Sequence, residues 1–189
     1  NLSPFLVCAG TNVFLDAYGI GVLEADDLII LATDACGIDV TTISETLFTC
    51  DDIGNHLITV SVFDPFGNES SCEVDVDVED KTAPEVECMD VIIELPDNGP
   101  YLLQLEEVLV SVEDACSDDI TFEFQNLFTC DNAGFNTISL QAFDEFGNVS
   151  NCNLNVIVID NEAPEAVCTD VTLDLDESGN AVVSSDEYA

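Results

Sequence analysis

The sequence predicts an all-β protein made of tandem immunoglobulin-like β-sandwich domains of about 80 residues, each with two disulfides. Three observations predict this fold. The cysteines recur every 80 positions, apolar and polar residues alternate in short segments, and Asp, Asn, Gly and Pro cluster between those segments. No long segment has helical periodicity. The predicted domains are residues 1–84 and 85–164, followed by the start of a third domain at 165–189.

The nine cysteines fall into four series whose members are 80 positions apart. The series are Cys8, Cys88 and Cys168; Cys36 and Cys116; Cys50 and Cys130; and Cys72 and Cys152. The residues around them repeat too, since Asp-Ala-Cys ends at Cys36 and again at Cys116. A register this strict predicts one small unit copied in tandem. Both ends of the sequence cut across the register, so we expect a longer array.

Short strands are expected in the earlier part of each repeat. In the second repeat they are residues 91–95, 108–112 and 120–124, which are rich in Val, Ile or Phe and are separated by turn-forming residues. Six or seven such strands in about 80 residues are typical of an immunoglobulin-like sandwich.

The last third of each repeat predicts a β-hairpin. Valines occupy alternate positions in residues 73–79, which is typical of a strand with one buried face. The preceding segment, 56–63, is rich in Ile, Val, Thr and Phe. Residues 64–68 between them are Asp-Pro-Phe-Gly-Asn, which favours a tight turn. Ala-Pro pairs at 83–84 and 163–164 follow the hairpin and suit a short, stiff junction.

Four cysteines in each small repeat favour disulfides and an oxidising, extracellular setting. A zinc-thiolate site is the weaker alternative, because there is no CxxC pair and His56 is the one histidine. Four cysteines allow three pairings, and the sequence alone does not choose among them. The first and last strands of such a sandwich lie side by side, which favours Cys8–Cys72 and leaves Cys36–Cys50 to close a local loop. The equivalent pairs in the second repeat are Cys88–Cys152 and Cys116–Cys130.

The chain is strongly acidic. It has 40 acidic residues and one basic residue, Lys81, which gives a formal net charge of −39. Such a surface repels phosphate backbones and anionic lipids, so we expect no nucleic-acid partner. Since 47% of the residues are hydrophobic, the chain can still bury cores and fold. No apolar run reaches the length of a membrane helix, so no direct membrane insertion is expected. Bound divalent cations or high salt must offset the self-repulsion.

Ca²⁺ is the cofactor that this acidity favours, because it is bound by carboxylate and carbonyl oxygens in loops. In a sandwich, the loop that holds Asp34 in the first repeat and the hairpin turn that holds Asp64 should lie at the same end. Their counterparts in the second repeat would face the junction, where Asp80 arrives from the first repeat. The sequence therefore predicts a metal site formed by Asp80, Asp114 and Asp144.

The remaining positions of this set await other repeats. Asp34 and Asp64 would be completed by a preceding repeat, and Asp160 by the third. Two alternatives stay open. Asp is favoured in turns with or without a metal, and cations could also be arranged differently. No dedicated calcium motif is present.

Other site classes have weaker support. Asn68 and Asn148 match the N-glycosylation pattern, but the same asparagines suit the turn, so chance is a sufficient explanation. We predict no catalytic residue and no enzymatic activity. Acidic residues in a distinctive context are duplicated 80 positions later, and basic residues that could stabilise an oxyanion are missing.

The chain resembles the HYR-like (hyalin-type) immunoglobulin-like repeats of large secreted surface proteins, such as the giant adhesins of gliding bacteria. The resemblance lies in the Asp-Ala-Cys segment 34–36, the Leu-Phe-Thr-Cys segment 47–50, the hairpin 63–72 and the exit at 83–84, each with its second copy. It covers essentially the whole chain, and the hairpin is its most specific part. It implies an extracellular stalk or adhesion role without enzymatic activity.

We therefore expect a structural segment of a long extracellular filament or cell-surface adhesin, built of disulfide-stapled and cation-stiffened repeats. Two alternatives are a polysaccharide-binding or spacer region of a larger secreted enzyme, and a subunit of a laterally assembled fibre that exchanges strands. The absence of Trp and the presence of three Tyr disfavour sugar binding. The expected partners are neighbouring repeats of the same chain and other copies in a filament, with no surface or glycan ligand specified.

Overall fold

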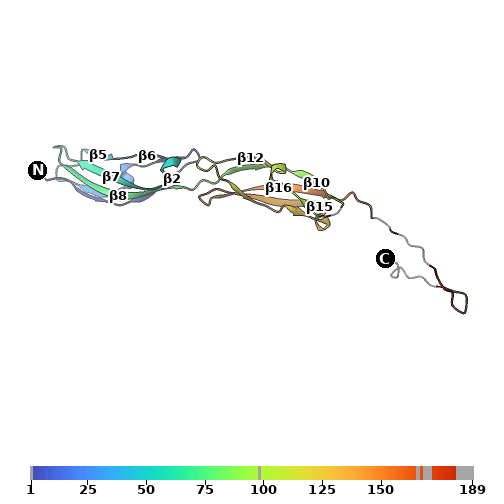
Figure 1. The fold of residues 1–189 in the computed structure, drawn as a ribbon. Helices are drawn as coiled ribbons and strands as arrows, with labels where there is room; N and C mark the ends of the chain where they lie inside the picture. The colour runs from blue at the N-terminus through green and yellow to red at the C-terminus, as the bar shows by residue number, and fades with distance from the viewer. Residues whose placement is uncertain (1, 98, 165–166, 168–171, 182–189) are drawn as a thin grey trace.

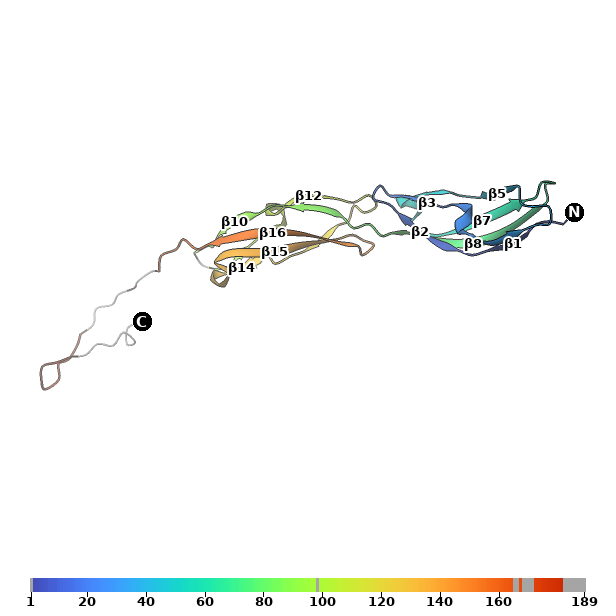
Figure 2. The same ribbon diagram turned by 180° about the vertical axis from the view of Figure 1, so that it is seen from behind.

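The computed structural model describes residues 2–97, 99–164, 167 and 172–181, and in these residues the chain folds into strands, loops and short 3-10 turns. Two elongated units lie end to end, one formed by residues 5–80 and the other by residues 85–159 (Figures 1 and 2). The predicted all-β class is confirmed. The domain boundaries stay predictions, and Cys168 and most of the predicted third repeat lie outside the described residues.

The first unit contains eight strands and two 3-10 turns. These are β1 Phe5–Cys8, β2 Thr11–Leu15, β3 Ile20–Val22, η1 Ala25–Asp27, β4 Ile29–Thr33, β5 Val40–Ile43, β6 Leu47–Thr49, η2 Cys50–Asp52, β7 Gly54–Phe63 and β8 Glu69–Asp80. A four-stranded sheet has the order β2-β8-β7-β5, and two further pairs are β1-β4 and β3-β6. β7 and β8 form the predicted hairpin, and β2 runs parallel to β8.

The second unit repeats this plan. Its elements are β9 Glu85–Cys88, β10 Val91–Glu94, β11 Tyr101–Leu102, η3 Leu105–Glu107, β12 Leu109–Glu113, β13 Thr121–Glu123, β14 Leu127–Phe128, η4 Cys130–Asn132, β15 Gly134–Phe143 and β16 Val149–Ile159. The four-stranded sheet has the order β10-β16-β15-β13, and the pairs are β9-β12 and β11-β14. Each strand therefore has the same neighbours as its counterpart 80 residues earlier.

The segment around Cys8 differs from the expectation of one first strand beside the last. β1 ends at Cys8 and pairs antiparallel with β4, whereas the parallel neighbour of β8 is β2. The chain changes sheets at Gly10, where a Cβ atom would overlap the carbonyl oxygen of Asp75 on β8. Glycine therefore permits the close backbone approach that lets one segment serve both layers.

The cores of the two units are built from equivalent positions. In the hairpin of the first unit, Val74, Val76 and Val78 are 8%, 0% and 1% exposed, as their alternation predicts. The buried apolar residues pack between the four-stranded sheet and the segments opposite it, on which Phe48 is fully buried. The pairs 80 positions apart include Val13 and Ile93, Leu23 and Leu103, Leu28 and Val108, Phe48 and Phe128, Ile58 and Ile138, Val60 and Leu140, and Val76 and Val156.

One disulfide lies within each unit. Cys8 is bonded to Cys72 and Cys88 to Cys152, the pairs expected from adjacency of the first and last strands. Each closes a loop with a sequence separation of 64 residues. By restricting the unfolded chain, a loop of that length contributes about 4 kcal/mol to stability. Small sandwiches with limited cores need such support.

The other predicted pairs, Cys36–Cys50 and Cys116–Cys130, are wrong. The third bridge joins Cys50 in the first unit to Cys116 in the second, so each unit holds one internal disulfide rather than two. Cys36 follows β4, near the Phe63 end of β7, and Cys50 precedes the Gly54 end of the same strand. A ten-residue strand spans about 30 Å. A disulfide holds its Cα atoms less than about 7 Å apart, so it cannot join the two ends.

Candidate metal centre at the junction of the two units

Three aspartates meet where the two units join. Asp80 is the last residue of β8, Asp114 follows β12, and Asp144 opens the hairpin turn after β15. One carboxylate oxygen from each lies within 4.8 Å of the others. Asp80 and Asp144 are 3% and 7% exposed. The first unit thus contributes one carboxylate to this centre, and the second unit contributes two.

Local turn chemistry orients all three side chains in the same way. Asp144 Oδ1 accepts hydrogen bonds from the backbone N–H groups of Phe146 (2.9 Å) and Asn148 (2.7 Å). The preference of Asp for bonding the backbone two residues ahead explains this turn. Asp114 Oδ1 likewise accepts from the backbone of Cys116 at 2.9 Å and Ser117 at 3.0 Å.

Asp80 completes the pattern at the end of β8. Its Oδ1 accepts from the backbone N–H of Thr82 at 2.9 Å and from the Thr82 hydroxyl at 2.6 Å. In all three aspartates, Oδ1 is thus engaged by its own loop, and the second oxygen is available for another interaction. Only for Asp144 is that oxygen also bonded to an amide, the Nδ2 group of Asn148 at 2.7 Å.

The second oxygen of Asp80 is the clearest sign of a missing ligand. Asp80 Oδ2 is buried and accepts no hydrogen bond from any residue that the structure describes. A buried, unpaired carboxylate oxygen is costly. Two unit charges at 4.8 Å also repel by about 3 kcal/mol at an effective dielectric constant near 20. The one basic side chain, Lys81, pairs with Glu79 and not with this cluster.

A hard divalent cation would satisfy these carboxylates. Ca²⁺ binds oxygen at 2.3–2.6 Å, so two ligands of one ion are at most about 5 Å apart. The 4.8 Å limit on the three oxygens fits that span. The shorter bonds of Mg²⁺, about 2.1 Å, limit opposite ligands to about 4.2 Å. The donor set therefore fits Ca²⁺, with backbone carbonyls or water completing the shell.

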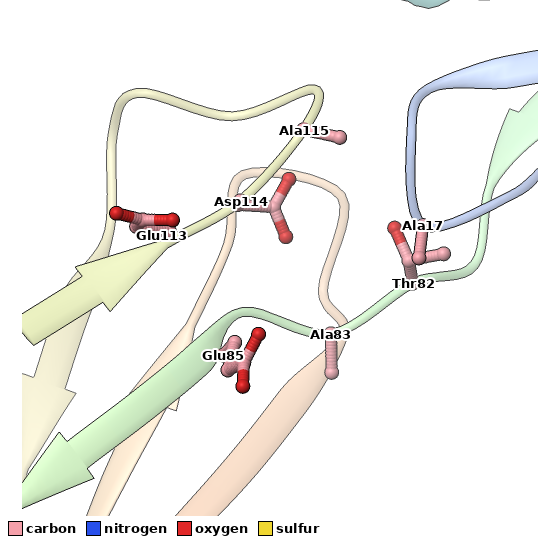
Figure 3. A pocket seen from close by; sticks show the side chains of 7 residues that line it. All are labelled: Ala17, Thr82, Ala83, Glu85, Glu113, Asp114 and Ala115. Carbon is pink, nitrogen blue, oxygen red and sulfur yellow. The ribbon is translucent and has the colours of Figure 1, made fainter.

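A pocket opens beside the cluster (Figure 3). It is lined by Ala17, Thr82, Ala83, Glu85, Glu113, Asp114 and Ala115. In Figure 3 the loop that carries Asp114 and Ala115 lies opposite Ala17 and Thr82 of the first unit. Two more carboxylates, Glu85 and Glu113, lie on the strands below. Solvent and ions can therefore approach the centre from an acidic opening.

The same junction is cross-linked covalently. The Cys50–Cys116 bridge joins η2 of the first unit to the loop after β12, with Cα atoms 5.1 Å apart. It packs against Gly19, whose φ is +70° and where a Cβ atom would overlap Cys50 Sγ. Asn148 Nδ2 also donates to the Asp80 carbonyl at 3.3 Å. The bridge, the hydrogen bond and the acidic cluster thus all connect the two units.

No protein-family model matches this chain, and no curated protein sequence does either. Among solved structures, the chain is similar to human protocadherin-24 EC1-2, with a TM-score of 0.39, 14% identity and coverage of 85% of this chain and 100% of that one. Drosophila N-cadherin EC1-4 gives a TM-score of 0.39 and 13% identity over 84% of this chain and 50% of that one. Human mucin-like protocadherin EC1-2 gives 0.34 and 13% over 83% and 98%. Likeness at this level does not define a function.

The other predicted metal ligands lie apart from this centre. Asp34 and Asp64 are at the opposite end of the first unit, where they repeat the geometry of Asp114 and Asp144. Asp34 Oδ1 accepts from Cys36 N at 2.7 Å, and Asp64 Oδ1 accepts from Asn68 N at 2.8 Å. Burial raises the pKa of Asp64, but hydrogen bonds from Asn68, Phe66 and Gly67 outweigh it and leave that pKa lowered.

Asp160 lies at the far end of the second unit. Its Oδ1 accepts from the backbone N–H of Glu162 at 3.1 Å. In the described residues, neither Asp160 nor the pair Asp34 and Asp64 belongs to a group of three metal-binding side chains. These positions offer parts of a centre, as expected for residues that face the ends of the two-unit segment.

The predicted glycosylation sites have structural roles in the turns. Asn68 Nδ2 donates to Asp64 Oδ2 at 2.6 Å, and Asn148 Nδ2 donates to Asp144 Oδ2. A glycan would be attached to the same nitrogen. These contacts favour the turn explanation for both asparagines.

The functional pair that the sequence did not indicate is Cys50 and Cys116. A usable signal was present, since residues 54–63 predict a strand long enough to keep Cys36 away from Cys50. Helices offer no alternative anchor: in the described residues, none is long and apolar enough to cross a membrane.

Proposed function

We propose that this chain is a segment of a long extracellular filament or cell-surface adhesin, in which immunoglobulin-like domains of about 80 residues follow one another in tandem. Calcium at Asp80, Asp114 and Asp144 stiffens the junction between them. The observation that carries the proposal is that the orphaned, buried Asp80 carboxylate of one unit meets two carboxylates of the next. Three disulfides support the extracellular setting, since such bridges persist in oxidising compartments.

The mechanism is mechanical. The strands of the two units are separated by residues 81–84, a four-residue connection that ends in Ala-Pro. A single short connection would still allow a hinge. The Cys50–Cys116 bridge adds a second covalent connection at a different point of the junction, so bending must strain one of the two. Rods formed in this way transmit force without relying on a large interface.

Calcium adds a switchable component to this stiffness. Its ligands come from both units, so the ion binds best when the units are held in the arrangement that brings the ligands together. It also removes repulsion among three carboxylates in a chain of net charge −39. The bound state is therefore expected to be straighter and more stable than the calcium-free state.

Calcium titration by isothermal calorimetry, with matched variants, tests the proposal. Asp144→Asn removes a ligand at the junction, whereas Asp64→Asn alters the equivalent turn at the far end. We expect saturable binding in the original chain, retained in Asp64→Asn and lost in Asp144→Asn. Small-angle scattering should show a narrower range of inter-unit angles with calcium. Equal binding by both variants, or no binding by the original chain, would contradict the calcium centre.

A further inference from the structure

The two cysteines that remain free are of complementary type. Cys36 is equivalent to Cys116, and Cys130 is equivalent to Cys50, each at a separation of 80 positions. The observed bridge joins Cys50 of one unit to Cys116 of the next. Cys36 and Cys130 are exposed and free within the described residues. One half of the same bridge is therefore present at each end of the segment.

We propose that Cys130 forms a disulfide with Cys36 of a second copy of this chain, docked end to end. The new junction would repeat the observed one. This cross-link rests on the geometry of the Cys50–Cys116 bridge and not on calcium, so it can fail or succeed independently of the proposed metal centre.

The loop around Cys36 already has the conformation of its bridged counterpart. The backbone N–H of Cys36 donates to Asp34 Oδ1 at 2.7 Å, and that of Cys116 donates to Asp114 Oδ1 at 2.9 Å. Both cysteines follow Asp-Ala, and both loops come directly after equivalent strands, β4 and β12. The donor loop therefore needs no rearrangement to present its thiol.

The turn around Cys130 matches its counterpart equally well. Cys50 and Cys130 each begin a 3-10 turn, η2 and η4. The backbone N–H of the preceding threonine donates to Asp52 Oδ2 at 2.8 Å in the first unit, and to Asn132 Oδ1 at 2.9 Å in the second. Both thiols are thus held by the same local structure.

A pocket lies beside Cys130 at the place that a docked loop would fill. Its lining includes Gly99, Pro100, Thr129, Cys130 and Asp160. In the first unit the equivalent glycine, Gly19, is covered by the incoming loop: a Cβ atom on it would lie 3.2 Å from Cys116 Sγ and 3.6 Å from the Ala115 Cβ atom. Gly99 meets no atom within 4 Å of the same position. The second unit therefore offers an unfilled receptor for an Asp-Ala-Cys loop.

Docking at this receptor would also complete a second acidic centre. Asp160 corresponds to Asp80, Asp34 to Asp114, and Asp64 to Asp144. The contact joins unlike ends of two copies and leaves one free end on each, so repetition gives an open linear chain rather than a closed dimer. An end-to-end filament follows from one repeated junction.

The reaction needs an oxidant, for which a low-molecular-weight disulfide such as glutathione disulfide is sufficient. The Cys130 thiolate attacks one sulfur of that disulfide, forming a mixed disulfide and releasing one glutathione thiolate. The Cys36 thiolate of the second copy then attacks the Cys130 sulfur and releases the second glutathione. Two protein thiols are oxidised to one disulfide, one glutathione disulfide is reduced to two thiols, and the two thiol protons pass to the released glutathiones.

Mixing two complementary variants tests the pairing. Both carry Cys168→Ser. One also carries Cys36→Ser and keeps Cys130, and the other carries Cys130→Ser and keeps Cys36. After oxidation in a glutathione buffer, non-reducing electrophoresis and peptide mass spectrometry measure the dimers. Docking raises the effective concentration of the correct thiol pair, so we expect about a tenfold excess of mixed dimers over like dimers. A random ratio, with mixed dimers about half of the total, would refute the proposal.

The chain with both cysteines and Cys168→Ser provides a second readout that is insensitive to partial misfolding of a variant. It should give a ladder of dimers, trimers and longer species that collapses on reduction. A product that stops at the dimer, or linked peptides of the Cys130–Cys130 type, would contradict end-to-end pairing. Repeating the oxidation with a calcium chelator separates the two proposals, because the mixed dimer should still form.

Discussion

Cys116 joins the covalent and acidic parts of the junction. Its Sγ atom is bonded to Cys50 of the other unit, and its backbone N–H donates to Asp114 Oδ1 at 2.9 Å. The bridge therefore fixes the loop that orients one of the three clustered carboxylates. Any change in the bridge should be felt at the centre, and any ion bound there should in turn affect the bridge.

The first prediction follows from this coupling. Replacing Cys50 and Cys116 together by Ser should weaken calcium binding by about tenfold, within the usual range of coupling between sites, because Asp114 then has to be ordered by the ion. Calorimetry measures the affinity. The control is Cys36→Ser with Cys130→Ser, which removes two thiols but no bridge and should leave the affinity unchanged. Similar affinities in all three proteins would show that the two features are independent.

A second prediction concerns Asp80→Asn. An Asn side chain can keep the bonds from Thr82 to Oδ1, and it replaces the unpaired Oδ2 by a donor facing two carboxylates. Without calcium we expect the melting temperature to rise, since about 1 kcal/mol corresponds to about 4–8 °C in a domain of this size. With calcium the variant should gain nothing, whereas the original chain should become more stable. Calorimetric melting with and without chelator measures both effects.

The acidic centre could be predicted from the sequence because topology alone places its members. Asp80 ends the last strand of one unit, and Asp114 and Asp144 follow strands that end at the facing edge of the next. Positions of this kind depend on strand order and not on side-chain detail. The 80-residue register also determined which residues would be equivalent, down to the buried core positions.

The bridge could not be predicted in the same way. Cys36 and Cys50 are close in sequence, which favours a local loop, but the length of β7 places them at opposite ends of the unit. The correct partner lies across a junction, and a pattern within one repeat contains no information about contacts between repeats. The change of sheets at Gly10 was missed for a similar reason, because it depends on how closely the chain passes Asp75.

A third prediction isolates the close packing around the bridge. Gly19 and Gly67 have similar backbone angles, with φ of +70° and +82°, but only Gly19 lies against the Cys50–Cys116 bridge, and a Cβ at Gly67 meets nothing within 4 Å. Gly→Ala at either site costs about 1 kcal/mol for the backbone conformation. Gly19→Ala should cost more and should make the bridge easier to reduce. Urea unfolding and the rate of thiol release under dithiothreitol measure the two effects, and equal results for both variants would contradict the packing argument.

The last prediction concerns acid stability and the contact of Asp90 with β16. Hydrogen bonds from the backbone N–H of Asn155 (2.7 Å) and from its Nδ2 (3.0 Å) outweigh burial and lower the pKa of Asp90. Because the folded-state pKa lies below the unfolded value, near 3.9, this contact stabilises the fold above that value. Its contribution is lost as the pH falls through the lower, folded-state pKa. Asp90→Asn should therefore be less stable than the original chain at neutral pH, and the difference should vanish in strong acid. Urea unfolding as a function of pH measures it, and a difference that stays constant below about pH 3 would show that the carboxylate charge is not responsible.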